Sequence, residues 1–217
     1  FRSAASLVKA LADPGPPPLD PKGLAGLRRL AVDGTPQPGL VMVGSHMPLA
    51  DQQLEELLVE PRCEGVELPV PRIARLLEAQ TPDLLADLEQ VWLQRLRVLL
   101  EAGSTPVLFS SRGELRCASE AESRRLSRTL AELMGRLAAA LAPDLGYLIS
   151  KGGTTTQTLL AKGLALESVH LEGQLLPGLS LVRPSAEPLR ELPILTFPGN
   201  LGGRDTLREA WRRMQSL

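Results

Sequence analysis

The sequence predicts an α/β fold: a three-layer sandwich, Rossmann-like, in which helices cover both faces of a mainly parallel or mixed sheet. Short apolar runs alternate with longer segments of helical periodicity along most of the chain. The first run, Leu40 to Val43, is uninterrupted, which is typical of a strand covered on both faces. Aromatic residues make up only 3% of the chain, so aliphatic side chains must build the core, and this favours helices on a sheet over an aromatic-rich β-sandwich.

The first 39 residues are predicted to precede the domain. Residues 2–12 show a short helical pattern, and the proline-rich stretch at 13–18 suits neither a helix nor a central strand. We therefore expect an N-terminal helix and Pro-rich linker over residues 1–39 and one domain over residues 40–217. Because the chain starts with Phe1 instead of Met, we expect it to be a fragment, a processed product or a chain whose start is missing.

The expected elements of the domain follow one another in order. Strands are predicted at 40–43, 66–70, 107–110, 146–149 and 194–197, with two short strands flanking Pro177-Gly178. Helices are predicted at 50–59, 81–102, 154–162 and 205–214, and one more begins at residue 119. Pro82 suits the first turn of the long helix, and Gly103 ends it. Ser119 and Glu122 form a capping box for the next helix, whose leucines recur at helical spacing.

Composition argues against several classes of protein. Lys plus Arg number 24 and Asp plus Glu 25, so no net field attracts nucleic acid or an anionic membrane. The run Arg124, Arg125 and Arg128 has the spacing of a solvated helix face. No apolar run approaches the roughly 20 residues of a membrane span, and no signal peptide is visible. Cys63 and Cys117 match no metal or redox spacing and indicate a reducing, cytoplasmic compartment.

Three segments share one layout, in which an apolar strand leads into a small-residue turn and then a helix. They are Val43-Gly44-Ser45-His46, Ser150-Lys151-Gly152-Gly153-Thr154 and Pro198-Gly199-Asn200-Leu201-Gly202. In an open α/β sheet such turns gather at the carboxyl edge of the strands, where ligands bind. Glycine lets the backbone approach a ligand closely, and a helix N-terminus supplies free N–H groups, so both suit phosphate. Lys151 would add a positive charge.

Each turn by itself also fits a structural role. A Gly-Gly turn before Thr is a tight connection with a good cap, and both Gly and Asn tolerate the left-handed conformation. The turns contain neither the P-loop pattern nor the GxGxxG fingerprint. His46 and His170 lack partners at metal-ligand spacing, and no carboxylate pair or serine elbow stands out. Catalytic residues and metal ligands are therefore not assigned.

Taken together, the motifs resemble the C-terminal, nucleotide-binding domain of the four-carbon acid sugar kinase family (DUF1537), which includes threonate and erythronate kinases. The resemblance runs from about residue 40 to the end of the chain. Its motifs appear in the family's order, which makes them more specific together than singly: Val41-Met42-Val43-Gly44-Ser45 with Gln53-Leu54, Ser150-Lys151-Gly152-Gly153-Thr154, Gly173-Gln174-Leu175-Leu176-Pro177-Gly178, and Phe197-Pro198-Gly199-Asn200-Leu201-Gly202.

The resemblance implies that ATP, carrying Mg²⁺, lies across these turns and that the family transfers phosphate to small acid sugars. The acid sugar would bind a separate N-terminal domain that this chain lacks, so we expect the chain alone to bind nucleotide without turnover. The implied nucleotide-binding residues all lie on the three turns: Ser45, Gly152, Gly153, Thr154, Thr155, Gly199 and Asn200.

Two departures from the family pattern keep a second hypothesis open. Ala50 stands where relatives often carry Thr, and Thr154 with Thr155 stand where some relatives have an acidic residue that would bear on metal binding. With the missing sugar domain, these departures motivate a non-catalytic nucleotide-binding or oligomerisation module, with a homodimer among its expected assemblies. A dinucleotide-dependent oxidoreductase ranks last, because Glu167 does not follow the required glycine fingerprint.

Overall fold

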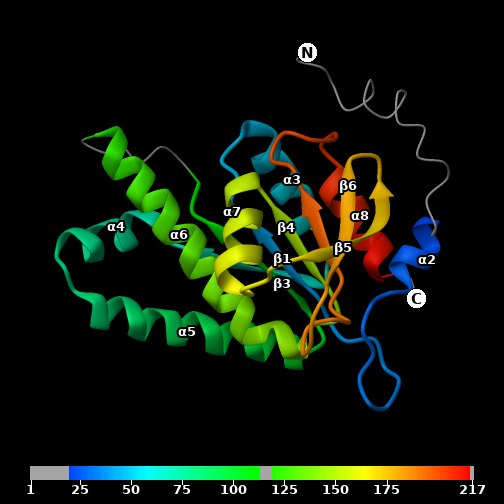
Figure 1. Ribbon diagram of the computed structural model, residues 1–217. Coiled ribbons are helices and arrows are strands. Elements are labelled where there is room, and N and C mark those ends of the chain that lie inside the picture. The colour runs from blue at the N-terminus through cyan, green and yellow to red at the C-terminus, as the bar shows by residue number, and fades with distance from the viewer. Residues whose placement is uncertain (1–19, 113–118, 216–217) are drawn as a thin grey trace.

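The computed structural model describes residues 20–112 and 119–215. A seven-stranded mixed sheet lies at its centre, and helices cover both faces (Figure 1). The predicted three-layer α/β fold is therefore confirmed. The helix predicted at 2–12 and the proline-rich stretch at 13–18 lie outside the described residues. Across the described ranges, no helix combines the length and apolar character that a membrane span requires.

The strands, in chain order, are β1 (Leu40–Val43), β2 (Cys63–Leu68), β3 (Thr105–Ser110), β4 (Leu148–Lys151), β5 (Val169–Leu176), β6 (Leu179–Pro184) and β7 (Ile194–Phe197). Their order in the sheet is β2-β3-β1-β4-β7-β6-β5. The first five strands of this order are parallel, whereas β6 runs antiparallel to β7 and β5 antiparallel to β6. The chain leaves β1 toward one side of the sheet and β4 toward the other, so the topological switch point lies between these two strands.

Seven α-helices belong to the described residues: α2 (Pro21–Ala25), α3 (Pro48–Leu58), α4 (Val70–Glu78), α5 (Pro82–Glu101), α6 (Glu120–Leu141), α7 (Gly153–Thr158) and α8 (Thr206–Gln215). A 3₁₀ turn (Ala142–Asp144) follows α6, and a π-helical turn (Leu159–Gly163) continues α7. The helices α4 to α7 cover one face of the sheet, and α2, α3 and α8 cover the other (Figure 1).

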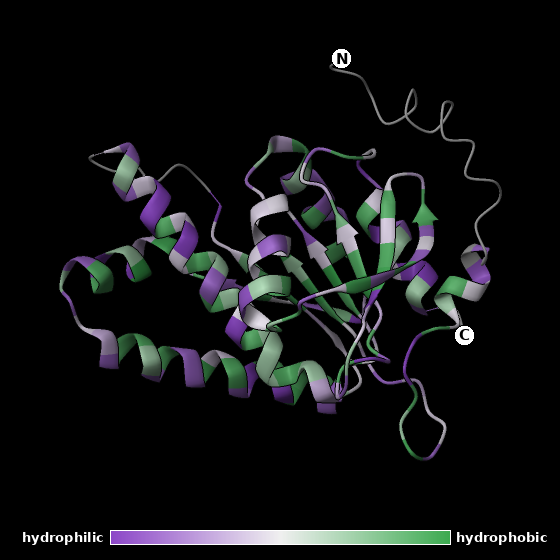
Figure 2. Cartoon of the chain, viewed as in Figure 1, coloured by the Kyte–Doolittle hydropathy of each residue, from purple (hydrophilic) through white to green (hydrophobic). Residues whose placement is uncertain are grey.

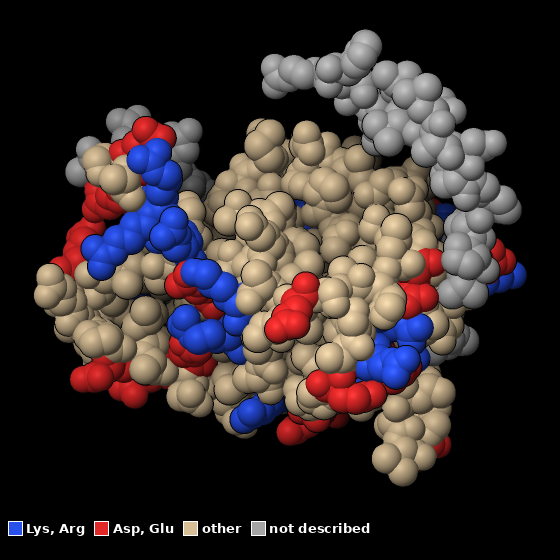
Figure 3. All heavy atoms as spheres, in the orientation of Figure 1, with Lys and Arg blue, Asp and Glu red and all other residues tan. Residues whose placement is uncertain are grey.

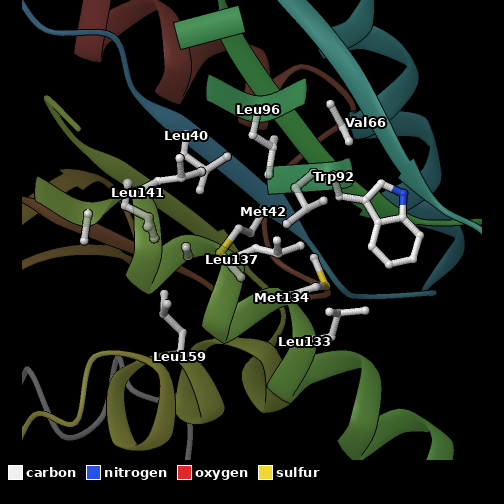
Figure 4. Close-up of a cluster of buried hydrophobic side chains, with 14 of the residues drawn as sticks. Leu40, Met42, Val66, Trp92, Leu96, Leu133, Met134, Leu137, Leu141 and Leu159 are labelled. Carbon is white, nitrogen blue, oxygen red and sulfur yellow. The ribbon is translucent and has the colours of Figure 1, made fainter. Parts of the chain in front are cut away.

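The strand β1 contributes side chains to the hydrophobic core on both faces of the sheet. Leu40 and Met42 belong to the cluster beneath α5 and α6, and Val41 and Val43 belong to the cluster beneath α3 and α8. All four side chains are fully buried, as the uninterrupted apolar run predicts. Figure 4 shows Leu40 and Met42 on the side of Leu137 of α6. Burial of each such side chain stabilises the fold by roughly 1.5–3 kcal/mol.

Helix α6 shows how the sequence pattern becomes a packed helix. Ser119 Oγ accepts a hydrogen bond from the N–H of Glu122 at 3.2 Å, so the predicted N-cap is confirmed. One stripe of the helix faces the core, including Leu126, Leu130 and Leu137. Figure 2 shows hydrophilic and hydrophobic residues mixed along α5 and α6, while the central strands are mostly hydrophobic. The helix is thus amphipathic and covers one face of the sheet.

Two of the predicted strands are shifted along the chain. The sequence places a strand at 66–70, whereas β2 covers Cys63–Leu68 and residue 70 begins α4. This strand lies at the edge of the sheet and alternates buried and exposed residues, so it lacks the apolar run by which β1 was found. The strand β4 lies two residues further along the chain than the predicted 146–149, because its last position is Lys151, a charged residue in a buried strand.

Residues 20–39 pack against the same body. Asp20 Oδ1 accepts a hydrogen bond from Gly23 N at 2.7 Å and caps α2. Leu24 and Ala25 are buried in the cluster that contains the residues of α8. The Nη1 of Arg28 donates to the carbonyl of Met214 at 3.4 Å and links this segment to the end of α8. The domain boundary at residue 40 stays a prediction, and the structure adds a packed segment before it.

Candidate functional site

The three predicted turns lie side by side at the carboxyl ends of β1, β4 and β7, which are neighbours in the sheet. Gly44 N donates to the carbonyl of Lys151 at 3.1 Å, and Gly152 N donates to the carbonyl of Phe197 at 2.9 Å. These hydrogen bonds extend the ladder one residue beyond the strands. The turns therefore meet at the switch point, where open α/β sheets bind ligands.

Ser45 is the point at which the three turns converge. A Cβ placed on Gly152 would lie 3.2 Å from Ser45 N, and a Cβ on Gly199 would lie 2.6 Å from Ser45 Oγ. Gly152 also has φ +118°, a region that L side chains rarely adopt. Glycine is thus required at 152 by conformation and at 199 by space, and both leave bare backbone beside the first turn.

Two of the predicted threonines have different surroundings. Thr155 is buried, and a Cβ on Gly44 would lie 2.0 Å from its Oγ1, so this hydroxyl fills the space that the first turn leaves. Thr154 and Gly153 are exposed at the start of α7, and Asn200 is exposed on the third turn. The structure therefore places all of the predicted residues on adjoining turns or in the first turn of α7, with Thr155 in a packing position.

The start of α7 offers free backbone donors. Its N-cap residue is Gly152, which has no side chain to accept hydrogen bonds from the first N–H groups. Thr156 Oγ1 donates to the carbonyl of Ser150 at 3.0 Å and fixes the helix start to the end of β4. A π-helical turn follows directly, a feature often found at functional sites.

Lys151 braces the third turn. Its side chain is fully buried, and Nζ donates to the carbonyls of Pro198 and Gly199, each at 3.2 Å. Nζ also lies 3.9 Å from the centroid of the Phe197 ring. Desolvation by burial, with a smaller contribution from Arg112, lowers the pKa of Lys151 to about 8. The ammonium group is thus engaged by carbonyls, whereas the sequence suggested a charge offered to phosphate.

Gln53 holds the third turn from the other side. Its buried amide donates from Nε2 to the carbonyl of Leu201 at 3.1 Å and to that of Gly203 at 2.6 Å. The residue lies on α3, which starts directly after the first turn. The Gln53 of the sequence motif therefore connects the helix that follows β1 to the loop that follows β7.

Arg112 is a candidate site residue that the sequence analysis did not select. It follows β3, and its Nη1 donates to the carbonyl of Ser45 at 2.6 Å and pairs with Asp51 Oδ1 at 3.0 Å. Its Nε and Nη2 are buried and have no hydrogen-bond partner. A signal for it was present, because Ser110-Ser111-Arg112 follows an apolar strand in the same layout as the three selected turns.

His46 lies between the first turn and the end of β3. Much of the residue is exposed, but its ring is partly buried where Nε2 lies 2.9 Å from Ser110 Oγ. Desolvation by burial, followed by the charge of Arg112, lowers the pKa of His46 below its ordinary value. The imidazole is therefore mainly neutral at pH 7. Among the described residues, no group of three His, Cys, Asp or Glu side chains gathers into a metal site.

Buried charge at this edge of the sheet is mainly positive. Lys151 is fully buried there and Arg112 is half-buried, and Asp51 is the one described carboxylate that forms an ion pair with either of them. In Figure 3 the exposed Lys and Arg side chains gather elsewhere, notably over α6, where Arg124 and Arg125 are exposed. The carboxyl edge thus combines few surface charges with a small excess of buried positive charge, which favours an anion.

A separate hollow lies away from the three turns, between α4, α5 and α6. Its volume is about 550 Å³, and it is lined mainly by apolar residues such as Leu76 and Leu85. Glu89 and Arg136, which pair with each other at 2.7 Å, lie on its rim. The size of this hollow does not make it the site, because none of its lining residues belongs to the three glycine turns.

An open α/β sheet with glycine turns and buried positive charge at its switch point defines an anion-binding α/β protein. Residues 40–207 match the family described as nucleotide-binding C-terminal domain, and the chain belongs to this family. None of the curated proteins is a significant match to the chain.

Solved structures show the same fold. A Bordetella bronchiseptica protein of the DUF1537 family, solved as a domain-swapped dimer with bound citrate, is 24% identical with a TM-score of 0.61 over 82% of this chain. The Haemophilus influenzae protein HI1011, also matched to DUF1537, is 16% identical with a TM-score of 0.62 over 83% of this chain. The match covers only 41% and 40% of those two proteins, respectively.

Proposed function

We propose that this chain binds the phosphates of ATP or ADP, carried with Mg²⁺, across the turns that follow β1, β4 and β7. The observation that carries the proposal is the convergence of these turns, since Ser45 touches the bare backbone of both Gly152 and Gly199. Membership of a nucleotide-binding family supports it. Bare amides and a helix start are the groups that recognise phosphate in open α/β proteins.

Each predicted residue then has a role. Gly153 and Thr154 are exposed at the start of α7. Their backbone N–H groups and the hydroxyl of Thr154 donate hydrogen bonds to phosphate. Ser45 reaches the nucleotide from the first turn, and Asn200, next to Gly199, closes the opposite side. The buried Thr155 keeps the first turn and α7 at a fixed separation.

Magnesium would arrive with the nucleotide. Mg²⁺ keeps several water molecules and commonly binds through phosphates and one or two carboxylates. The described residues contain no cluster of three ligating side chains. The phosphates would therefore supply most of the ligands in this proposal, with hydroxyls such as that of Thr154 within the same turn.

We further propose that the chain is the nucleotide-holding part of a cytoplasmic ATP-dependent kinase for a small, four-carbon acid sugar. The family is described as a C-terminal domain, and the solved relatives are longer than this chain. The Bordetella protein holds citrate, a hydroxy acid of similar chemical class. Phosphoryl transfer depends on positioning and electrostatics, which such turns supply. The groups that bind the acid would lie outside residues 40–217.

Isothermal titration calorimetry with ATP and ADP, with and without Mg²⁺, tests the proposal. We expect saturable binding at one site and no phosphorylation of four-carbon acid sugars by this chain alone. Far-UV circular dichroism establishes that the protein is folded. A folded protein that gives no heat with millimolar nucleotide would refute nucleotide binding.

A second candidate function, self-association, is favoured by one face of α5. Its exposed apolar residues recur every seven positions, and two acidic residues near its start precede two basic ones in its second half, before the terminal Glu101. A second copy packed antiparallel would place opposite charges together. The residues are Leu84, Val91 and Val98, exposed by 51%, 62% and 51%, with Asp83 and Asp87 near the start and Arg95 and Arg97 near the end.

Sedimentation velocity separates the two candidates. If self-association uses α5, Val91→Glu converts a dimer into a monomer and leaves ATP binding unchanged. The double variant Gly152→Val with Gly199→Val has the opposite effect, because it fills the nucleotide turns and does not touch α5. A wild-type protein that sediments as a monomer at all concentrations rules out self-association through this face.

A further inference from the structure

We infer that Arg112 is the phosphate-binding side chain of this site, and that its Nε and Nη2 together hold two oxygens of one phosphoryl group. The inference rests on the proposed nucleotide binding and adds a side-chain ligand to the backbone groups described above. Arg112 follows β3, so it adds a fourth strand end to the three turns.

The arrangement of donors on the guanidinium carries the inference. Nη1 is occupied, because it donates to the carbonyl of Ser45 at 2.6 Å and pairs with Asp51 at 3.0 Å. Nε and Nη2 are the two unpartnered atoms. These two nitrogens form the side-on edge of the guanidinium, whose parallel N–H groups match two oxygens of a phosphate or a carboxylate. Nε and Nη2 can therefore donate two parallel hydrogen bonds to two oxygens of one anion.

The guanidinium is also held in position against the first turn. Its contact with the Ser45 carbonyl joins Arg112 to the residue that touches both Gly152 and Gly199. Its carbon Cζ lies 5.9 Å from the centroid of the Phe109 ring, which supports the guanidinium from β3. An anion at the convergence of the turns is thus next to a fixed cation, so little conformational entropy is lost when the guanidinium binds.

Burial makes an acceptor for this edge favourable. Both nitrogens are shielded from solvent, and a buried donor without a partner is costly to the folded state. About a fifth of the side chain stays exposed, at 22%, although Nε and Nη2 themselves are shielded. Binding an anion would then replace two unmade hydrogen bonds by two charge-assisted ones.

Two other basic groups near the turns, Lys151 and His46, are less suited to phosphate. The ammonium of Lys151 already donates to two carbonyls, and its pKa is lowered to about 8. Burial and Arg112 itself lower the pKa of His46, so the imidazole is mainly neutral at pH 7. Arg112 is therefore the cation with both a permanent charge and free donors.

Calorimetry on four proteins tests the inference: the wild type, Arg112→Gln, Arg112→Lys and the control Arg136→Gln. Arg136 forms a bidentate pair with Glu89 between α5 and α6, away from the turns. Each protein is titrated with ATP, ADP and adenosine. We expect Arg112→Gln to weaken ATP and ADP binding by at least tenfold, Arg112→Lys to weaken it by a smaller factor, and adenosine binding to stay unchanged in all four.

The outcomes are distinguishable. A folded wild type that binds no nucleotide overturns both the proposed function and the role of Arg112. A wild type that binds ATP, with Arg112→Gln binding it equally well, overturns only the role of Arg112. An equal loss of ATP and adenosine binding also overturns it, because that pattern marks a structural residue. If Arg112→Gln fails to fold, Arg112→Lys provides the test. ATP affinity equal to that of the wild type in Arg112→Lys would overturn the proposed two-nitrogen contact with phosphate.

Discussion

At the scale of single residues, Lys151 is the group whose protonation most directly reports the environment of the site. Its pKa is lowered to about 8 from 10.5, mainly by burial, so between these pH values the unfolded chain binds more protons at this residue than the folded chain does. Its contribution to the free energy of unfolding therefore rises with pH through that window.

Comparison with Lys151→Met isolates this contribution. We predict that the stability of the wild type relative to the variant increases between pH 8 and pH 10.5, measured by urea unfolding at several pH values. Other groups, including Cys63 with its pKa raised to about 12, cancel because both proteins carry them. A difference that is constant or that falls with pH contradicts the buried, carbonyl-bonded ammonium.

The glycines of the turns give a second prediction at this scale. Gly152→Ala places a Cβ 3.2 Å from Ser45 N at a positive φ, and Gly199→Ala places one 2.6 Å from Ser45 Oγ. We predict that each costs about 1–3 kcal/mol of stability and weakens ATP binding. Gly203→Ala is the matched control, since nothing lies within 4 Å of its added Cβ. Urea unfolding and calorimetry measure both effects, and equal behaviour of the three variants would refute the close approach.

At the scale of elements, the contact between α6 and the π-helical turn after α7 is set by two glycines. A Cβ on Gly163 would lie 2.7 Å from the carbonyl oxygen of Gly135, whereas a Cβ on Gly135 would lie 3.5 Å from Gly163 Cα. The two substitutions therefore have opposite consequences. We predict that Gly163→Ala destabilises the protein by about 1–3 kcal/mol.

Gly135→Ala serves as the reciprocal test. Its added Cβ makes an ordinary contact, and alanine is favoured over glycine inside a helix by up to about 1 kcal/mol. Thermal unfolding of the pair is expected to show a lower midpoint for Gly163→Ala and an unchanged or higher midpoint for Gly135→Ala. The reverse order would mean that the helix and the π-helical turn do not meet as described.

Which elements were predictable follows from their surroundings. The bounds of β1 and β7 were predicted correctly, because β1 is an uninterrupted apolar run, β7 is interrupted only by Thr196, and both lie inside the sheet. The helix α4 was missed because it is short and starts one residue after Pro69, where a strand was expected to continue. The end of β4 was missed because the buried Lys151 donates its side-chain hydrogen bonds to carbonyls of the turn after β7, which the local sequence does not reveal.

At the scale of the whole molecule, the order of the strands in the sheet determines which turns and side chains come together at the site. The shared strand–turn–helix layout predicted which residues meet at the carboxyl edge, and the structure brings those turns together. It did not predict that Arg112 joins them, because the place of β3 beside β1 depends on pairings between residues more than 60 positions apart, such as Val41 and Val107. Local patterns locate the turns, and long-range topology selects their partners.

The central claim is that the backbone amides of the three turns bind one phosphate group. The most direct test is to record amide ¹H–¹⁵N NMR spectra during a titration with ADP and Mg²⁺. We predict that the largest shifts occur together at Ser45, Gly153 and Gly199, and that they saturate at one nucleotide per chain. Shifts confined to other parts of the molecule, or unchanged spectra at millimolar ADP, would contradict the claim.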